Sequence, residues 1–407
     1  MTDNDQHTTG LGRRAVLTAA ALGAGGAVLG AAGTAQAQDQ GGAAGPARGD
    51  SRSSGHGSGH GGPYSGAPKL PVPAIVGHRG TAGYRPEHTF GSYEYALEIG
   101  ADIVEQDVVP TRDGHLVCRH EPEIGGTTDV ADHPEFAARR TTKTLDGVPT
   151  TGWFTEDFTL AELKRLRAVE RLPAVRQRNT IYNGRWDIPT FAEVLAWADR
   201  EGRKRGRPVW LHTETKHPSY FRGIGLPLEE RLVKLLRPYG RHRADAPQFL
   251  QSFEAQSLQR LGKLGAEVRK VFLLNGLTSR PWDFVVAGDP RTVADLVTPA
   301  GLRWIATFAQ GIGPTAELVI PLDATGHLLG PSTLVRDAHR EGLILHPFTA
   351  RNENQFLPAD FRVGTDPNAY GNPVDAFRTW FATGIDGLFT DNSDTAVLAR
   401  EDYWNHA

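Results

Sequence analysis

The stretch IVEQDVVPTRDGHLVCRH, residues 103–120, has the pattern of two β-strands joined by a turn. Glu105 and Asp107 stand two residues apart in the first strand, and His120 ends the second. Side chains at positions i and i+2 of a strand lie on the same face, so both carboxylates point the same way. Two adjacent negative charges on a face that should meet a core indicate a functional site.

Similar runs recur from residue 74 onward, and helical patterns separate most of them. The eight predicted strands are residues 74–80, 102–108, 115–120, 209–216, 248–253, 270–275, 343–349 and 387–391. The predicted helices are residues 89–99, 159–169, 190–201, 227–237, 255–264, 331–341 and 373–383. Strands that alternate with helices indicate a parallel sheet covered by helices, and eight such units predict a (β/α)₈ TIM barrel. A doubly wound open sheet is the alternative fold.

Two connections are too long for simple loops between a strand and a helix. They span roughly residues 121–189 and 276–330, and we expect both to carry insertions, after the third and the sixth predicted strand. The first insertion leaves the carboxyl end of a strand, which is where a barrel keeps its active site.

Charged residues and histidines occupy the ends of the first four predicted strands. They are His78 and Arg79, Glu105 and Asp107, His120, and Glu214 with Lys216. In a barrel these ends converge on one face. Carboxylates held close together repel one another, and a cation relieves that repulsion. Oxygen ligands favour Ca²⁺ or Mg²⁺, whereas zinc would call for histidine or cysteine ligands.

The basic residues and histidines of this set indicate an anionic substrate. Arg79 and Lys216 beside an acidic metal site fit a phosphate group best. His78 and His120 suit a general base and a general acid for an oxygen nucleophile and an alkoxide leaving group. Each residue alone has an ordinary explanation, such as a core histidine or a surface ion pair. Their recurrence at four successive strand ends argues against chance.

These residues lie within motifs of a known family. The motifs are GHRG (77–80), RPEHTFGSYEYALEIGAD (85–102), VEQDVVPTRDGHLVCRH (104–120), TETK (213–216), FAQGIGP (308–314), HPFTARNENQFLP (346–358) and GIDGLFTDNSD (384–394). In this order and spacing, the chain resembles the glycerophosphodiester phosphodiesterase family, in particular its exported, longer bacterial members. The resemblance covers about residues 70–400.

The resemblance implies a (β/α)₈ barrel that hydrolyses glycerophosphodiesters to sn-glycerol 3-phosphate and an alcohol. It assigns His78 and His120 to acid–base catalysis, Arg79 and Lys216 to phosphate binding, and Glu105, Asp107 and Glu214 to one divalent cation, Ca²⁺ rather than Mg²⁺. It also implies that Glu87 orients Arg79 or a histidine. The alternative role for Glu87 is that of an acid at a helix N-terminus, favoured by the helix dipole.

The chain departs from the family pattern at two positions beside these residues. His88 stands where the family usually has Asn, and Glu121 where it commonly has Asp. Both replacements are polar, so they put the surroundings of the site in question and leave the reaction class unchanged.

The N-terminal part of the chain has the pattern of an export signal. Arg13 and Arg14 precede an uncharged Ala- and Gly-rich stretch that ends in Ala-Gln-Ala at residues 35–37, which predicts a twin-arginine-type signal peptide. A transmembrane anchor is the alternative, but the many glycines disfavour it. We therefore divide the chain into a signal peptide (1–37), a disordered Gly/Ser/His-rich linker (38–68) and a barrel domain (69–407).

Composition limits the partners and the alternatives. A net charge near −3 gives no electrostatic footprint for nucleic acid, and we expect a small-molecule substrate and no membrane insertion after signal cleavage. Cys118 is the single cysteine and is predicted to be a small buried hydrophobe.

One alternative function is that of a phospholipase-type barrel (lysophospholipase D or phosphoinositide-cleaving) with an apolar lip from Phe348, Trp380 and Phe381. Another is a non-catalytic exported metal-binding module. The sequence alone identifies neither the alcohol nor the oligomeric state.

Overall fold

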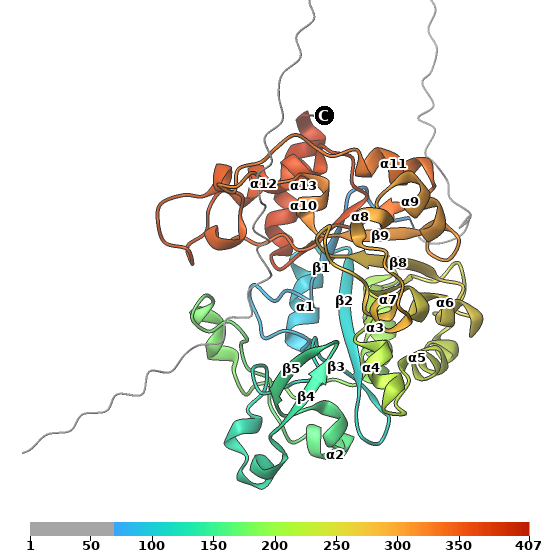
Figure 1. Cartoon of the computed structure of the whole chain (residues 1–407). Coiled ribbons are helices and arrows are strands. Elements are labelled where there is room, and N and C mark those ends of the chain that lie inside the picture. The colour runs from blue at the N-terminus through green and yellow to red at the C-terminus, as the bar shows by residue number, and fades with distance from the viewer. Residues whose placement is uncertain (1–68, 407) are drawn as a thin grey trace, which may run out of the picture. The chain divides into compact units, whose positions relative to one another are not determined.

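The computed structural model describes residues 69–406, which form a barrel of parallel strands surrounded by helices (Figure 1). The barrel strands are β1 (Ala74–Gly77), β2 (Ile103–Pro110), β6 (Trp210–Thr215), β7 (Gln248–Ser252), β8 (Arg269–Leu274), β9 (Gly311–Pro314), β10 (Ile344–Leu345) and β11 (Gly387–Thr390). Their order is β10-β9-β8-β7-β6-β2-β1-β11. Backbone hydrogen bonds from Asp386 to Leu345 and from Ala350 to Phe389 join the two edges of this sheet. The predicted (β/α)₈ barrel is confirmed.

Helices follow most barrel strands and cover the outside of the sheet (Figure 1). They are α1 (Phe90–Glu98), α2 (Leu160–Leu163), α3 (Phe191–Arg205), α4 (Pro218–Gly223), α5 (Leu228–Leu236), α6 (Ala255–Lys263), α7 (Trp282–Ala287), α8 (Val293–Leu296), α9 (Pro299–Ala306), α10 (Ala316–Val319), α11 (Leu334–Arg340), α12 (Pro373–Phe381) and α13 (Ser393–His406). Short 3₁₀ turns are Val130–Asp132, Pro134–Arg139, Thr155–Asp157, Gln177–Tyr182, Arg237–Tyr239, Asn354–Phe356 and Ala359–Phe361. Helix α3, for example, begins at a capping box between Thr190 and Glu193.

The third predicted strand is not a barrel strand. β3 (Leu116–Cys118) pairs antiparallel with β2, with Val117 opposite Val109. The turn between the two strands is short, and a parallel pair would need a crossover of a dozen or more residues. Because β3 runs back along β2, the amide of Arg119 reaches the carbonyl of Asp107 at 3.1 Å. His120 therefore returns to the level of the carboxylates.

The sixth barrel strand in chain order, β9, lies inside the segment that was predicted to be an insertion. Its sequence, GIGP, lacks the β-branched run expected of a strand. Close packing against the neighbouring strands favours glycine at both positions. A Cβ on Gly311 would lie 2.7 Å from Ile344 Cγ1, and one on Gly313 would lie 2.5 Å from Leu273 Cδ2. The neighbouring strands, and not local propensity, determine this strand.

Both insertions follow the predicted third and sixth strands, β3 and β8, although β3 is not itself a barrel strand. The first follows the β2–β3 hairpin and contains α2 and the hairpin of β4 (Thr141–Leu145) and β5 (Val148–Gly152), which Figure 1 shows gathered at one side of the molecule. The helix predicted at residues 159–169 is reduced to α2, because Ala168 pairs with Thr128 in a β-bridge. The second insertion holds α7, α8 and α9 and ends at β9.

Apolar side chains fill the inside of the barrel and the space between sheet and helices. Trp210, Phe249 and Phe389 are among the interior group, and Cys118 belongs to the outer one. Cys118 is fully buried, and burial raises the pKa of its thiol to about 12. Its predicted role as a buried hydrophobe is confirmed.

In the part of the chain that the structure describes, no helix combines the length and the apolar character that crossing a membrane requires. The signal peptide (1–37) and the linker (38–68) lie outside the described residues and stay predictions.

Candidate active site

The carboxyl ends of β1, β2 and β6 open into a cavity of about 500 Å³. Its lining includes every residue predicted at the four strand ends, namely His78, Arg79, Glu105, Asp107, His120, Glu214 and Lys216. The predicted convergence on one face is therefore confirmed, although one of the four strands is the partner of a hairpin and not a barrel strand.

The three carboxylates form a buried cluster with excess negative charge. Asp107 and Glu214 are register partners on β2 and β6, and Glu105 precedes Asp107 by two residues. Burial, reinforced by Asp107, raises the pKa of Glu105 well above its usual range and that of Glu214 to about 8. Among the described residues, Asp107 Oδ1 is buried and has no hydrogen-bond partner. This donor set fits a hard divalent cation, which would neutralise the cluster and occupy the free oxygen.

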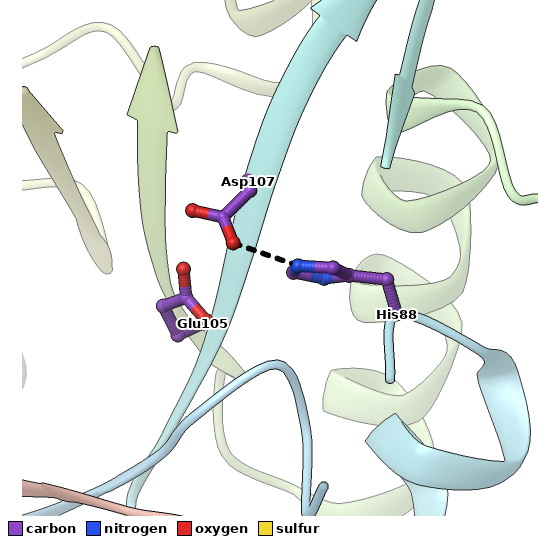
Figure 2. A group of neighbouring side chains, drawn as sticks. All are labelled: His88, Glu105 and Asp107. Atoms are coloured by element: carbon purple, nitrogen blue, oxygen red, sulfur yellow. Dashed lines mark hydrogen bonds and ion pairs between the residues drawn. The ribbon is translucent and has the colours of Figure 1, made fainter. Parts of the chain in front are cut away.

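His88 joins this cluster (Figure 2), and sequence reasoning treated it only as a polar replacement. Ligand atoms of His88, Glu105 and Asp107 lie within 4.8 Å of one another. Nε2 of His88 lies 2.8 Å from Asp107 Oδ2, and Nδ1 lies 3.0 Å from the hydroxyl of Tyr93. Because both ring nitrogens have partners, His88 orients the Asp107 carboxylate and leaves oxygen atoms to face a cation.

Arg79 is held by carboxylates on two sides. Its backbone N–H donates to Glu105 Oε2 at 2.6 Å, and its Nη1 donates to Glu87 Oε2 at 2.7 Å. Helix α1 starts after the N-cap residue Thr89, so Glu87 lies outside the first turn. The alternative role of Glu87 as a helix N-terminal acid is therefore wrong, and its partner is Arg79. Arg171 from the first insertion pairs with the same Glu87 oxygen at 2.8 Å.

The two histidines have carboxylate partners at Nδ1. His78 Nδ1 lies 2.6 Å from Asp391 Oδ1, and His120 Nδ1 lies 3.0 Å from Glu121 Oε1. Burial and the nearby Arg79 lower the pKa of His78 to about 4 and that of His120 to about 3. Both rings are therefore neutral at pH 7 in the free protein. A carboxylate at Nδ1 favours the tautomer in which Nε2 carries the lone pair.

Lys216 connects the carboxylates to His120. Its Nζ lies 3.1 Å from Glu214 Oε1 and 3.3 Å from His120 Nε2. The lysine is buried, and the surrounding carboxylates, led by Glu214, raise its pKa although burial opposes this. Lys216 is therefore a fixed cation, and together with Arg79 it gives the acidic cavity two positive groups.

A second histidine chain links the first insertion to the barrel rim. His217 Nε2 lies 2.9 Å from Glu121 Oε2, and its Nδ1 lies 2.7 Å from Asp146 Oδ2 in the turn of the β4–β5 hairpin. Burial would lower the pKa of His217, but hydrogen bonds to Asp146 and Glu121 raise it to about 9. His217 is therefore an imidazolium that bridges two carboxylates at neutral pH.

This bridge predicts a pH-dependent contribution to stability. The folded pKa of about 9 exceeds the unfolded value of about 6.5. The stabilisation is therefore complete below pH 6.5 and is lost as the pH rises through 9. It amounts to roughly 2–4 kcal/mol. Urea unfolding of the wild type and of His217→Gln should differ by this amount at pH 6 and by much less at pH 10. An equal difference at both pH values would contradict the assignment.

The apolar lip proposed for the phospholipase-type alternative does not form. Phe348 lines the cavity, but Trp380 and Phe381 pack into the core on α12.

The residues that sequence reasoning missed include Asp391, Arg176 and Arg351. Asp391 and Arg351 lie within the family motifs and Arg176 lies in the first insertion, but a single aspartate or arginine in a loop carries no pattern that marks its partner.

The comparisons with known proteins decide the family. Residues 78–395 match the sequence model of the glycerophosphoryl diester phosphodiesterase family. The chain belongs to this family. It is 36% identical to glycerophosphodiester phosphodiesterase GDPD6 of Arabidopsis thaliana, over 78% of this chain and 83% of the relative. It is 26% identical to a glycerophosphodiester phosphodiesterase of Haemophilus influenzae, over 79% and 88% of the two chains.

Solved structures support the same fold. A phosphodiesterase of Oleispira antarctica, determined in complex with the product sn-glycerol-3-phosphate, has a TM-score of 0.51 at 19% identity, over 81% of this chain and 97% of the other. A candidate glycerophosphoryl diester phosphodiesterase from Silicibacter pomeroyi has a TM-score of 0.57 at 20% identity, over 81% and 94%. The predicted enzyme class, a glycerophosphodiester phosphodiesterase, is confirmed by the family and its relatives.

Proposed function

We propose that this enzyme hydrolyses glycerophosphodiesters to sn-glycerol 3-phosphate and an alcohol by acid–base catalysis at a divalent-cation site. The observation that carries the proposal is the shared cavity, in which two neutral histidines lie beside a buried cluster of three carboxylates and two fixed cations. The product bound in the Oleispira antarctica structure supports the choice of product.

Glu105, Asp107 and Glu214 would hold one divalent cation. We propose Ca²⁺ rather than Mg²⁺, because Ca²⁺ accepts irregular sets of oxygen ligands and Mg²⁺ requires near-ideal octahedral geometry. When bound, such an ion supplies Lewis-acid stabilisation of charge on the phosphoryl oxygens. Arg79 and Lys216 line the same cavity and would pair with the phosphate. Glu87 would keep Arg79 in place through its 2.7 Å contact.

The two histidines would exchange protons in two steps. In the first, Nε2 of His78 takes the proton of the glycerol 2-hydroxyl, whose oxygen attacks the adjacent phosphorus. His120 would have to enter this step as the imidazolium, because its ring is neutral in the free protein. It then gives its Nε2 proton to the oxygen of the departing alcohol, and a cyclic 1,2-phosphate forms. In the second step water opens the ring, His120 takes the proton of water, and His78 returns its proton to the 2-oxygen. Attack within one molecule avoids the entropic cost of recruiting a water for the first step.

A product assay tests the reaction. Glycerophosphocholine, glycerophosphoethanolamine, glycerophosphoglycerol and glycerophosphoinositol should each yield sn-glycerol 3-phosphate and the free alcohol, and a 2-deoxyglycerol analogue should be inert. Release of phosphorylated alcohol instead of sn-glycerol 3-phosphate would contradict the proposed cleavage. Hydrolysis of the 2-deoxy analogue at the normal rate would replace the cyclic route by direct attack of water.

We further propose that the chain is exported by the twin-arginine route, with residues 1–37 as the signal and 38–68 as a linker. The paired arginines and the weakly apolar stretch after them support this. Replacing Arg13 and Arg14 by lysine should trap the precursor in the cytoplasm, and the exported wild type should begin at Gln38. Unchanged export of the double variant would favour the general secretory route.

A further inference from the structure

Asp391 is the acidic partner of His78 and is supplied by the opposite end of the chain. Its Oδ1 lies 2.6 Å from His78 Nδ1, although 313 residues separate the two. Strand pairing fixes the contact, because β1 and β11 are parallel neighbours with Gly77 opposite Thr390. The amide of His78 also donates to the carbonyl of Thr390 at 2.9 Å. The backbones on both sides of the pair are therefore held in place.

Two arginines bind the other carboxylate oxygen of Asp391. Arg176 Nη2 lies 2.7 Å and Arg351 Nε 2.8 Å from Oδ2. Arg176 comes from the first insertion and is itself held by Glu353 Oε1 at 2.7 Å. Asp391 is 1% exposed. Burial would raise its pKa, but Arg176 and Arg351 hold it well below the usual range. The carboxylate therefore stays ionised.

An ionised carboxylate only accepts hydrogen bonds. The ring nitrogen that faces Oδ1 must then carry the proton, which leaves the lone pair of His78 on Nε2. His78 lines the cavity, so Nε2 is the nitrogen available to a substrate hydroxyl. A histidine in the opposite tautomer would have no lone pair there and could not act as a base.

We propose that Asp391 is a positioning residue that fixes His78 in the Nδ1–H tautomer, and that Arg176 and Arg351 clamp Asp391 for this purpose. The inference rests on the proposed function, which makes His78 the base. It also gives the first insertion a part in the reaction, because Arg176 reaches Asp391 from there.

The test compares Asp391→Asn with the wild type. The amide is nearly isosteric, but its NH₂ can donate to Nδ1 and so favours the Nε2–H tautomer. We expect kcat to fall by ~10²–10⁴-fold, the range for a lost proton carrier, with KM and calorimetric Ca²⁺ affinity changed little. ¹⁵N spectra of the full chain labelled at histidine, assigned by loss of a signal in His78→Gln, should show His78 protonated at Nδ1 in the wild type and at Nε2 in Asp391→Asn.

Asp102→Asn is the matched control. Asp102 is a partly buried aspartate that, like Asp391, pairs with an arginine. Its Oδ2 accepts from the amide of Ile75 at 2.8 Å and pairs with Arg400, away from the cavity residues. This variant should lose stability and keep both kcat and the His78 signal.

Two outcomes would overturn the proposal. One is an Nε2–H tautomer of His78 in the wild type, a measurement that does not depend on any variant folding. The other is an unchanged His78 signal in Asp391→Asn. A tautomer change with full kcat would support the positioning by Asp391 and refute the proposed role of His78 as base, which separates the two failures.

Discussion

Removal of divalent cations with EDTA is expected to lower kcat by about 10³-fold or more, and added Ca²⁺ should restore it. Electrostatic stabilisation by a catalytic cation is worth several kcal/mol, and each 1.36 kcal/mol is a factor of ten in rate. The physical reason lies in the buried cluster of Glu105, Asp107 and Glu214, in which burial, reinforced by Asp107, raises the pKa of Glu214 to about 8 without a bound ion. Calorimetry on the chelated protein should find one strong site.

Single substitutions distinguish the effect of the proposed cation ligands from that of other carboxylates in the cavity. Asp107→Asn and Glu214→Gln should each weaken Ca²⁺ binding and lower kcat. Glu254→Gln is the control, because Glu254 is a buried carboxylate in the same cavity lining whose partner is Ser219. It should retain the Ca²⁺ affinity of the wild type. Full activity of metal-free protein would remove the cation from the proposed mechanism.

His120→Ala is expected to lower kcat by ~10²–10⁴-fold on natural substrates, the usual range for a lost proton carrier. The loss arises because an alkoxide leaves poorly without a proton. A nitrophenyl ester of glycerol phosphate leaves without one, so its hydrolysis by His120→Ala should be close to normal. Steady-state rates on both substrates give the comparison.

His115→Ala is the control for this variant. His115 lies in the turn region of the same β2–β3 hairpin, and 54% of its side chain is exposed. It should behave as the wild type on both substrates. An equal loss of kcat on natural and nitrophenyl substrates would contradict the assignment of His120 as the acid and would indicate a role in orienting the substrate.

Local patterns accounted for most of the barrel and failed where contacts between strands decide. The alternation of apolar runs and helices located seven of the eight barrel strands. It missed β9, whose two glycines pack closely against Ile344 and Leu273 on neighbouring strands. The same patterns wrongly predicted that β3 is a barrel strand, because a short strand has the same sequence pattern whether it pairs parallel or antiparallel with its neighbour. Only the length of the connection to β2 distinguishes the two cases.

The candidate site was predicted to a similar extent. Two patterns were sufficient to predict which of the strand-end residues line the cavity. They are the two-residue spacing of Glu105 and Asp107 and the polar residues at the strand ends. The partners of these residues were not predicted. His88, for example, approaches Asp107 because its backbone is left-handed, with φ of 54°, and the buried Arg119 holds the carbonyl of His88 at 3.0 Å.

The sequence by itself determined the barrel, the face that carries the chemistry and the residue types at its centre, since each follows from a repeat of two or of 3.6 residues within one element. Only the tertiary structure decided which distant groups meet. Asp391 reaches His78, Arg176 reaches Asp391, and Asp146 reaches His217, each across tens to hundreds of residues. The physical reason is that strand register and the path of an insertion set these contacts, and neither leaves a periodic trace in the chain.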